Sequence, residues 1–150
     1  ALMQGLAESG AEHGVPVLLS THPRTRARLG QAGIAVPRNI ILAEPFGFAD
    51  FVALERDALA VLTDSGTVQE DSALLPVPNL PFRDTTARPE TQECGSNVVA
   101  GGTAEAIRRC LRVALASGTD WPIPSEYEQR PVASTVLRLL HGEIPSGSAR

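Results

Sequence analysis

The sequence contains no lysine, because all thirteen of its basic residues are arginine. A chain without lysine cannot form a Schiff base with a carbonyl substrate or with pyridoxal phosphate. It also lacks the lysine that a Walker-type phosphate loop requires. The composition therefore excludes these two kinds of lysine-dependent site from this chain.

Cysteine and long apolar runs are also scarce. Only Cys94 and Cys110 are present, and no C-x-x-C pair occurs, which favours a reduced, cytoplasmic protein. No apolar run approaches the roughly 18 residues that span a membrane, and no signal peptide opens the sequence. The three histidines are scattered and match no metal-ligand spacing. We therefore expect neither a bound metal nor a membrane partner.

The charge balance and the length give the broad class. The formal net charge is -4, and no basic stripe with interleaved aromatics occurs, so nucleic acid is not an expected partner. The 150 residues are 43% hydrophobic, which is enough for one compact domain with its own core. We predict one domain over residues 1–142 and a disordered tail over residues 143–150. Since the first residue is not Met and residues 1–3 are typical of a helix, we expect the chain to begin inside a longer gene product.

Short apolar runs alternate with segments typical of helices. The runs are four to six residues long and apolar on both faces, as in the strands of a covered parallel sheet. Strands are predicted over residues 15–20, 40–43, 59–63, 78–82 and 97–100. Helices are predicted over residues 24–32, 48–57, 67–75, 88–93, 103–117 and 132–140. This order predicts an α/β fold with a doubly wound parallel sheet, Rossmann-like in its connections.

Ligands of such sheets bind at the carboxyl ends of the strands. The turns there are residues 21–26, 44–48, 64–67, 83–88 and 101–103. In the third turn, Ser65, Gly66 and Thr67 would place free N–H groups and a hydroxyl at the positive end of a helix, which suits a phosphate. Gly66 would let the ligand approach the backbone. The alternative is an ordinary helix cap, in which a side chain accepts from the first amides.

The fourth turn belongs to the stretch RDTTARPE, residues 83–90. Arg88 precedes a proline, which suits the first turn of a helix. Its guanidinium could bridge a diphosphate, or pair with Asp84 or Glu90. A purely structural salt bridge is the alternative.

The first two turns are less specific. Within residues 21–26, His22 could donate to a phosphate or a sugar hydroxyl, and Arg24 and Arg26 add positive potential. A lone histidine before a proline is, however, more often structural. Residues 44–51 hold three of the four phenylalanines, which could stack on a base or pack in the core.

Taken together, these segments resemble the non-hydrolysing UDP-N-acetylglucosamine 2-epimerases. The family motifs H-P-R-T-R, P-x-x-Y-x-x-F, D-S-G-G-x-Q-E-E, R-x-T-T-E-R-P-E and a glycine-containing stretch correspond to residues 22–26, 45–51, 64–71, 83–90 and 93–95. The resemblance is close over residues 15–102 and extends loosely to residue 140. It implies a GT-B-like architecture of two Rossmann-like domains, of which this chain would be the C-terminal, UDP-binding half.

The resemblance also implies binding roles for six residues. Phe51 corresponds to an aromatic that packs on the uracil, and Asp71 to an acid that holds the ribose hydroxyls. His22 corresponds to a histidine near the nucleotide-sugar sites. The other three contact the diphosphate in the family and are listed here as Ser65, Gly66 and Arg88.

The reaction of the family inverts C2 of the sugar by eliminating and re-adding UDP, without NAD or another cofactor. The essential carboxylates lie in the N-terminal domain of the family, so the resemblance implies that this chain alone is inactive. The implied partners are a UDP-sugar, that N-terminal domain and a second copy in a homodimer.

Several positions depart from the family pattern. Thr67 replaces the second glycine of the phosphate loop, Asp71 replaces a glutamate, and Ala87 replaces the first glutamate of T-E-R-P-E. The late Y-G-x-G segment appears as residues 127–130, YEQR, without either glycine. Two alternatives therefore stay open: an epimerase of another UDP-2-acetamido sugar, and a non-catalytic nucleotide-sugar-binding module. A GT-B-like glycosyltransferase half is disfavoured by the R-P-E signature.

Overall fold

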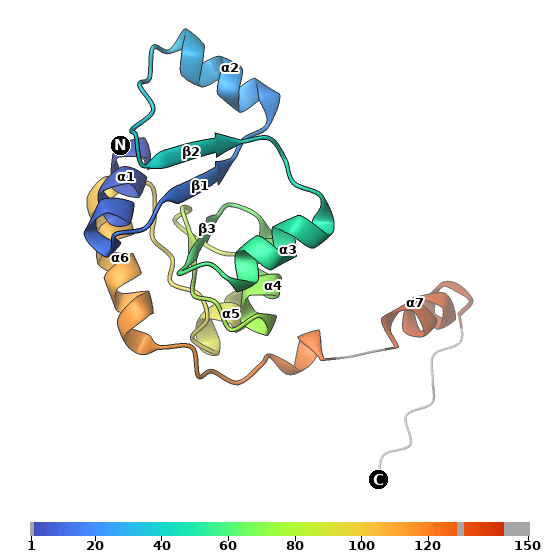
Figure 1. Ribbon diagram of the computed structural model, residues 1–150. Coiled ribbons are helices and arrows are strands. Elements are labelled where there is room, and N and C mark those ends of the chain that lie inside the picture. Colours follow the sequence, from blue (N-terminus) through green and yellow to red (C-terminus); the bar gives the residue numbers. More distant parts are fainter. Residues whose placement is uncertain (1, 129–130, 143–150) are drawn as a thin grey trace.

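The computed structural model describes residues 2–128 and 131–142. Helices and short strands alternate along the chain, as the sequence predicts (Figure 1). The elements are α1 (Leu2–His13), β1 (Val17–Ser20), α2 (Pro23–Gln31), β2 (Ile40–Ala43), α3 (Phe48–Arg56), β3 (Val61–Thr63), α4 (Gly66–Leu74), β4 (Asn79–Pro81), α5 (Pro89–Glu93), α6 (Ala104–Ser117), η1 (Ser125–Tyr127) and α7 (Val132–Leu140). Each predicted helix is present to within about two residues at either end, which is the usual uncertainty of helix boundaries.

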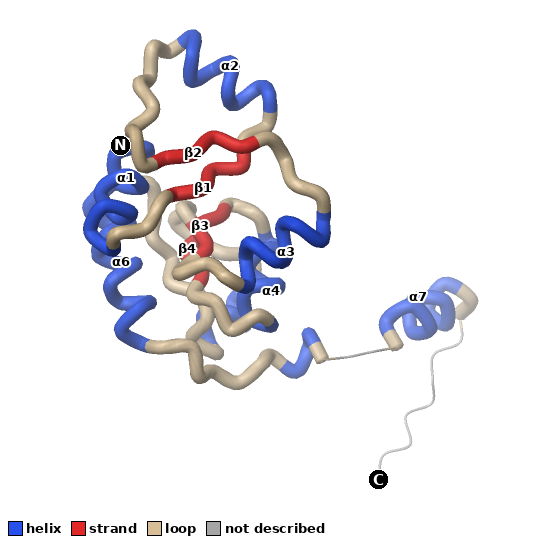
Figure 2. The backbone as a smooth tube through the Cα atoms, in the orientation of Figure 1, coloured by secondary structure: helices blue, strands red, loops and turns tan. Residues whose placement is uncertain are grey.

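The strands form two parallel pairs. β1 pairs with β2 in the register Val17 to Ile40, and β3 pairs with β4 in the register Val61 to Asn79. β1 contacts α1, while β4 contacts α6 and also α4, which packs against α3 (Figure 2). Because parallel strands align their carboxyl ends, the turns after the strands of each pair open at the same edge.

The strand predicted over residues 97–100 is present only as a single bridge between Asn79 and Asn97. Backbone bonds do continue along this segment, from Val98 N to Asn79 O (2.9 Å) and from Ala100 N to Pro81 O (2.9 Å). Pro81 has no amide N–H to return to the segment, so the ladder loses a rung. The prediction of a full strand is wrong for this reason.

The core lies between β4 and α6. Leu80 of β4 and Ile107 of α6 are fully buried, and four further small or aliphatic residues complete the cluster: Ala100, Cys110, Leu111 and Ala114. The helix begins at Thr103, whose hydroxyl accepts from the amide of Ala106 at 3.2 Å. It ends at Gly118, which has a positive φ of 76°.

Helix α1 packs along α6, although the sequence indicated a helix only over residues 1–3. The approach is close at Gly5, where a Cβ would lie 2.8 Å from the Cα of Ala104. Two ion pairs join the helices: Glu8 pairs with Arg108 (3.1 Å), and Glu12 pairs with Arg112 (2.6 Å). Glycines lower helical propensity, so the segment gave a weak signal even though glycine is what the packing requires.

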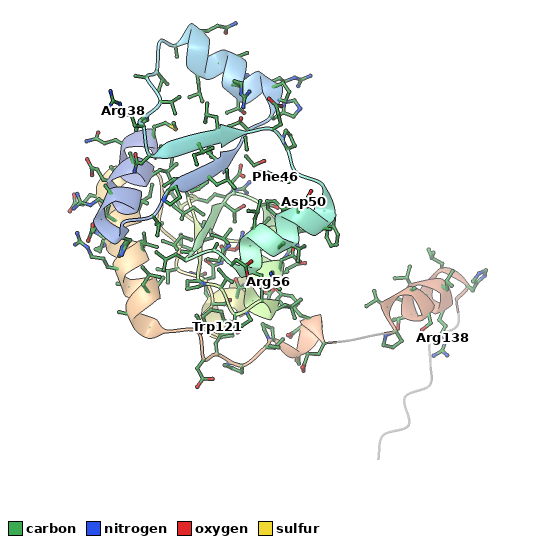
Figure 3. The ribbon with its side chains drawn as sticks, viewed as in Figure 1. Arg38, Phe46, Asp50, Arg56, Trp121 and Arg138 are labelled. Atoms are coloured by element: carbon green, nitrogen blue, oxygen red, sulfur yellow. The ribbon has the colours of Figure 1, made fainter. Side chains whose placement is uncertain are left out.

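Helix α7 matches the amphipathic helix predicted over residues 132–140. Its apolar side chains have no cover among the described residues (Figure 3). The exposed fractions are 57% at Val132, 46% at Val136, 56% at Leu137, 61% at Leu139 and 77% at Leu140. No helix in the described part of the chain is long and apolar enough to cross a membrane. The tail predicted over residues 143–150 lies outside the described residues.

Candidate functional site

The N-terminus of α4 follows β3 directly, as the sequence predicts. Ser65 is the N-cap residue, and its amide donates to the hydroxyl of Thr63 at 3.0 Å. Its own hydroxyl lies 3.0 Å from that of Thr67 and, among the described residues, makes no capping bond to the helix. The ordinary cap is therefore not what forms here. The first amides of α4 stay free of Ser65 and can donate to an anion.

Arg88 lies over this helix start. Its guanidinium carbon and one terminal nitrogen are 3.4 Å from the position of a Cβ at Gly66. A hydrogen-bonded ion pair joins Arg88 to Glu70, one turn along α4. The guanidinium thus lies beside the uncapped start of α4, so backbone N–H groups and a positive charge are available together to an anion.

The pairing of Arg88 corrects one expectation from the sequence. Asp84 and Glu90 are its neighbours in the chain, but its partner is Glu70, eighteen residues earlier. The reason is that α5 packs against α4, which brings the two segments together. Glu90 instead accepts a hydrogen bond of 2.5 Å from the hydroxyl of Tyr127. This bond is the main reason that the pKa of Glu90 lies below its usual value.

The second part of the site lies between α3 and α4. Phe51 and Glu55 are one helical turn apart on α3, and Asp71 of α4 is close to Glu55. Burial raises the pKa of Asp71, and the charge of Glu70 adds to the effect. Burial, and then the charge of Asp71, raises the pKa of Glu55 to about 7. Phe51 and Asp71 are both half-buried.

His22 follows β1, on a different turn from Ser65, Gly66 and Arg88. Its Nδ1 accepts from the amide of Arg24 at 3.2 Å and so caps α2, whose first residue is Pro23. This is the structural role that the sequence left open as the alternative. Arg26 pairs with Glu44 (2.7 Å) and so ties the ends of β1 and β2 together.

The phenylalanines after β2 divide between two environments. Phe46 and Phe51 are half-buried, whereas Phe48 is 82% exposed. Figure 3 shows Phe46 in the turn before α3 and Asp50 at the start of that helix. Core packing is therefore wrong as an account of Phe48, whose side chain is largely open to a ligand or a partner.

A C-terminal segment, residues 119–127, packs against α4 and α5. Trp121 donates from its indole nitrogen to the carbonyl of Ala73 at 3.1 Å, and so anchors the segment to α4 (Figure 3). Tyr127 follows in η1 and reaches Glu90. Burial, together with this bond, raises the pKa of Tyr127. The segment of residues 119–127, which we call the strap, therefore contacts both α4 and α5.

Sequence reasoning assigned no role to three polar residues of this region. Glu55 shares a helix face with Phe51, a spacing of four that could have been noticed. Gln69 belongs to the matched motif, but its buried bonds to distant segments have no local signal. Tyr127 stands beside the site only because residues 119–127 fold back. Among the described residues, no group of three potential ligands gathers to hold a metal.

Comparisons with known proteins show to which family the chain belongs. A family model described as UDP-N-acetylglucosamine 2-epimerase matches residues 1–140. The UDP-N-acetylglucosamine 2-epimerase of Methanocaldococcus jannaschii is 34% identical over 127 residues, which are 82% of this chain and 35% of that protein. The UDP-2,3-diacetamido-2,3-dideoxy-D-glucuronate 2-epimerase of Pseudomonas aeruginosa is 34% identical over 100 residues, 67% of this chain and 28% of that protein.

The fold is also shared. The crystal structure of the Methanocaldococcus jannaschii UDP-GlcNAc 2-epimerase in complex with UDP-GlcNAc and UDP superposes with a TM-score of 0.82 at 31% identity. The match covers 93% of this chain and 39% of that one. The likeness confirms the predicted α/β, Rossmann-like fold, and the chain spans about a third of the length of the curated relatives it matches. The chain belongs to the UDP-N-acetylglucosamine 2-epimerase family.

Proposed function

We propose that this chain is the UDP-binding half of a UDP-N-acetylglucosamine 2-epimerase. The observation that carries the proposal is the guanidinium of Arg88 over Gly66, at a helix start whose amides Ser65 does not cap. A relative of the same fold is described in complex with UDP-GlcNAc and UDP, which supports the same ligand class here. Phe51 and Asp71 would hold the uracil and the ribose.

The reaction would interconvert UDP-GlcNAc and UDP-ManNAc. A carboxylate removes the proton on C2 while the C1–O bond to UDP breaks, and UDP adds back after a proton returns on the other face. Negative charge grows on the diphosphate as that bond breaks, and the α4 amides and Arg88 are placed to stabilise it. This chain would thus retain the leaving group between the two halves of the reaction.

The carboxylate that removes the C2 proton would come from an N-terminal domain outside this chain. Two observations support a further domain: the chain spans 35% of its Methanocaldococcus jannaschii relative, and the apolar face of α7 is exposed. A helix face with Leu139 and Leu140 61% and 77% exposed needs cover in a folded protein. On this view the isolated chain binds UDP but does not turn a substrate over.

A second substrate has support of its own. The Pseudomonas aeruginosa relative is named for a UDP-2,3-diacetamido sugar acid, and it has the same 34% identity to this chain as the Methanocaldococcus jannaschii enzyme, over a shorter match of 100 residues. Since UDP binding is common to both, this chain alone does not choose the sugar. A binding module without turnover is the remaining alternative, favoured by Thr67 and Ala87, which depart from the family motifs.

Calorimetric titration with UDP, and then with UDP-N-acetylglucosamine, tests the proposal. We expect both ligands to bind with similar affinity, and Arg88→Ala to weaken UDP at least about tenfold, because a charge-assisted bidentate contact is lost. Arg112→Ala is the matched control, since it removes one positive charge and one ion pair on α6. An unchanged affinity of Arg88→Ala for UDP would refute the proposed function. So would a folded wild-type chain that does not bind UDP.

A further inference from the structure

Gln69 is a buried polar residue at the centre of the site, with an exposed fraction of 3%. Its amide nitrogen donates to the carbonyl of Ser65 at 3.0 Å. Its amide oxygen accepts from the hydroxyl of Thr86 at 2.5 Å and from the side-chain nitrogen of Asn97 at 2.8 Å. One side chain therefore joins the phosphate loop to the loop before α5 and to the segment after it.

The backbone of Arg88 is fixed through the same bonds. Its amide donates to the hydroxyl of Thr86 at 3.0 Å, and its carbonyl accepts from the hydroxyl of Thr91 at 2.7 Å. Asn97 donates to Thr91 at 2.9 Å as well as to Gln69. We call these four residues, Gln69, Thr86, Thr91 and Asn97, the Gln69 network.

The network determines a distance that matters for the ligand. The guanidinium of Arg88 lies 3.4 Å from a Cβ position at Gly66, so the loop at the start of α4 and the loop before α5 are in close contact. A diphosphate can contact the amides of one loop and the arginine of the other only if both stay in register. Small errors of placement at such sites cost much of the binding or the rate.

We propose that Gln69 is a positioning residue of the nucleotide site. Its side chain fixes the carbonyl of Ser65 and, through Thr86, the backbone of Arg88 at one separation, so that both loops contact the same diphosphate. The inference rests on the proposed function, because it assigns a role within that site. It adds that the affinity of the diphosphate depends on a residue that does not touch it.

A direct replacement of Gln69 leaves several buried groups without partners and can prevent folding. Thr86→Val is the more specific substitution, because it keeps the shape of the side chain and removes only the hydroxyl that bonds both Gln69 and the amide of Arg88. Thr86→Ser keeps that hydroxyl. Thr85→Val makes the same chemical change at the exposed neighbouring threonine, and serves as the matched control.

The measurement is the affinity for UDP divided by the affinity for uridine, taken for the whole chain and each variant. We expect Thr86→Val to lower this ratio about tenfold, since the misplaced arginine affects only the diphosphate. Thr86→Ser and Thr85→Val should keep the wild-type ratio. A merely structural role for Thr86 would weaken both ligands alike and leave the ratio unchanged, which would overturn the proposal.

Amide hydrogen exchange decides the case without any ligand. The amide of Arg88 donates to the hydroxyl of Thr86, so its exchange should quicken in Thr86→Val and stay slow in Thr86→Ser and Thr85→Val. If the wild-type chain binds no UDP, the proposed function fails while this result still tests the network. Unchanged exchange in Thr86→Val would show that the network does not hold Arg88.

Discussion

Replacing Glu55 by glutamine tests how the buried carboxyl group of α3 affects the free energy of unfolding. Glu55 is 3% exposed, and neither of its carboxylate oxygens has a hydrogen-bond partner among the described residues. Burial, followed by the charge of Asp71, raises its pKa from 4.5 to about 7. A charged group in this position is therefore costly, and the folded chain keeps the proton that the unfolded chain releases.

The magnitude follows from the two pKa values. Between pH 4.5 and about 7 the folded state binds a proton that the unfolded state has lost, so stability falls as the pH rises through this window. At about 1.4 kcal/mol per pH unit, the loss of stability approaches about 3–4 kcal/mol above pH 7. Glutamine has the same shape and no charge to lose, so Glu55→Gln should abolish this part of the pH dependence.

Urea denaturation at pH 5, 6, 7 and 8 measures the effect. We expect the variant and the wild-type chain to be about equally stable at pH 5, and the variant to be the more stable at pH 8. Asp71 keeps its own raised pKa, so some pH dependence should persist in the variant. Glu93→Gln, at an exposed glutamate of α5, controls for the loss of one charge. Parallel curves for the wild-type chain and Glu55→Gln from pH 5 to 8 would refute the reasoning.

Two further changes probe the packing and the strap. Gly5→Ala places a Cβ 2.8 Å from the Cα of Ala104, a backbone atom that cannot turn away, so it should lower the free energy of unfolding by about 1–3 kcal/mol; unchanged denaturation would show that α1 does not pack this closely. Tyr127→Phe removes the hydrogen bond to Glu90 and should cost about 1 kcal/mol at pH 7. Because that bond lowers the pKa of Glu90, the cost should be present above pH 4.5 and shrink as the pH falls through the lowered pKa; a cost that is constant from pH 7 to pH 3 would contradict this origin.

The order of elements and the ligand-binding edge could be predicted from the sequence, because both depend on local patterns. Short apolar runs gave β1 to β4, and the turns after them hold Ser65 and Arg88, as predicted. The strand over residues 97–100 failed because its partner contains Pro81, and a pairing partner cannot be read from one strand alone. Helix α1 was underestimated because Gly5, which its packing needs, argues locally against a helix.

The sequence predicted that three of the candidate phosphate-binding residues lie at one edge of the fold, but it did not predict their contacts. Ser65, Gly66 and Arg88 were named from their motifs, and the structure brings them together. The partner of Arg88 was wrong, because proximity in the chain is a poor guide to proximity in space. The carboxyl group of Glu55 was missed altogether, since only the packing of α3 on α4 shows that it is buried.

The buried face of α4 is half polar, and this limits the substitutions that can make the protein more stable to heat. Gln69 and Ser72 lie on that face beside Val68 and Ala73, and Ser72 accepts a hydrogen bond from Asn79 at 3.1 Å. A larger apolar side chain at Gln69 or Ser72 would leave buried donors and acceptors of the neighbouring segments without partners, so it should lower the free energy of unfolding. A search for more heat-stable variants of this chain therefore has to leave the inner face of α4 unchanged and change residues elsewhere.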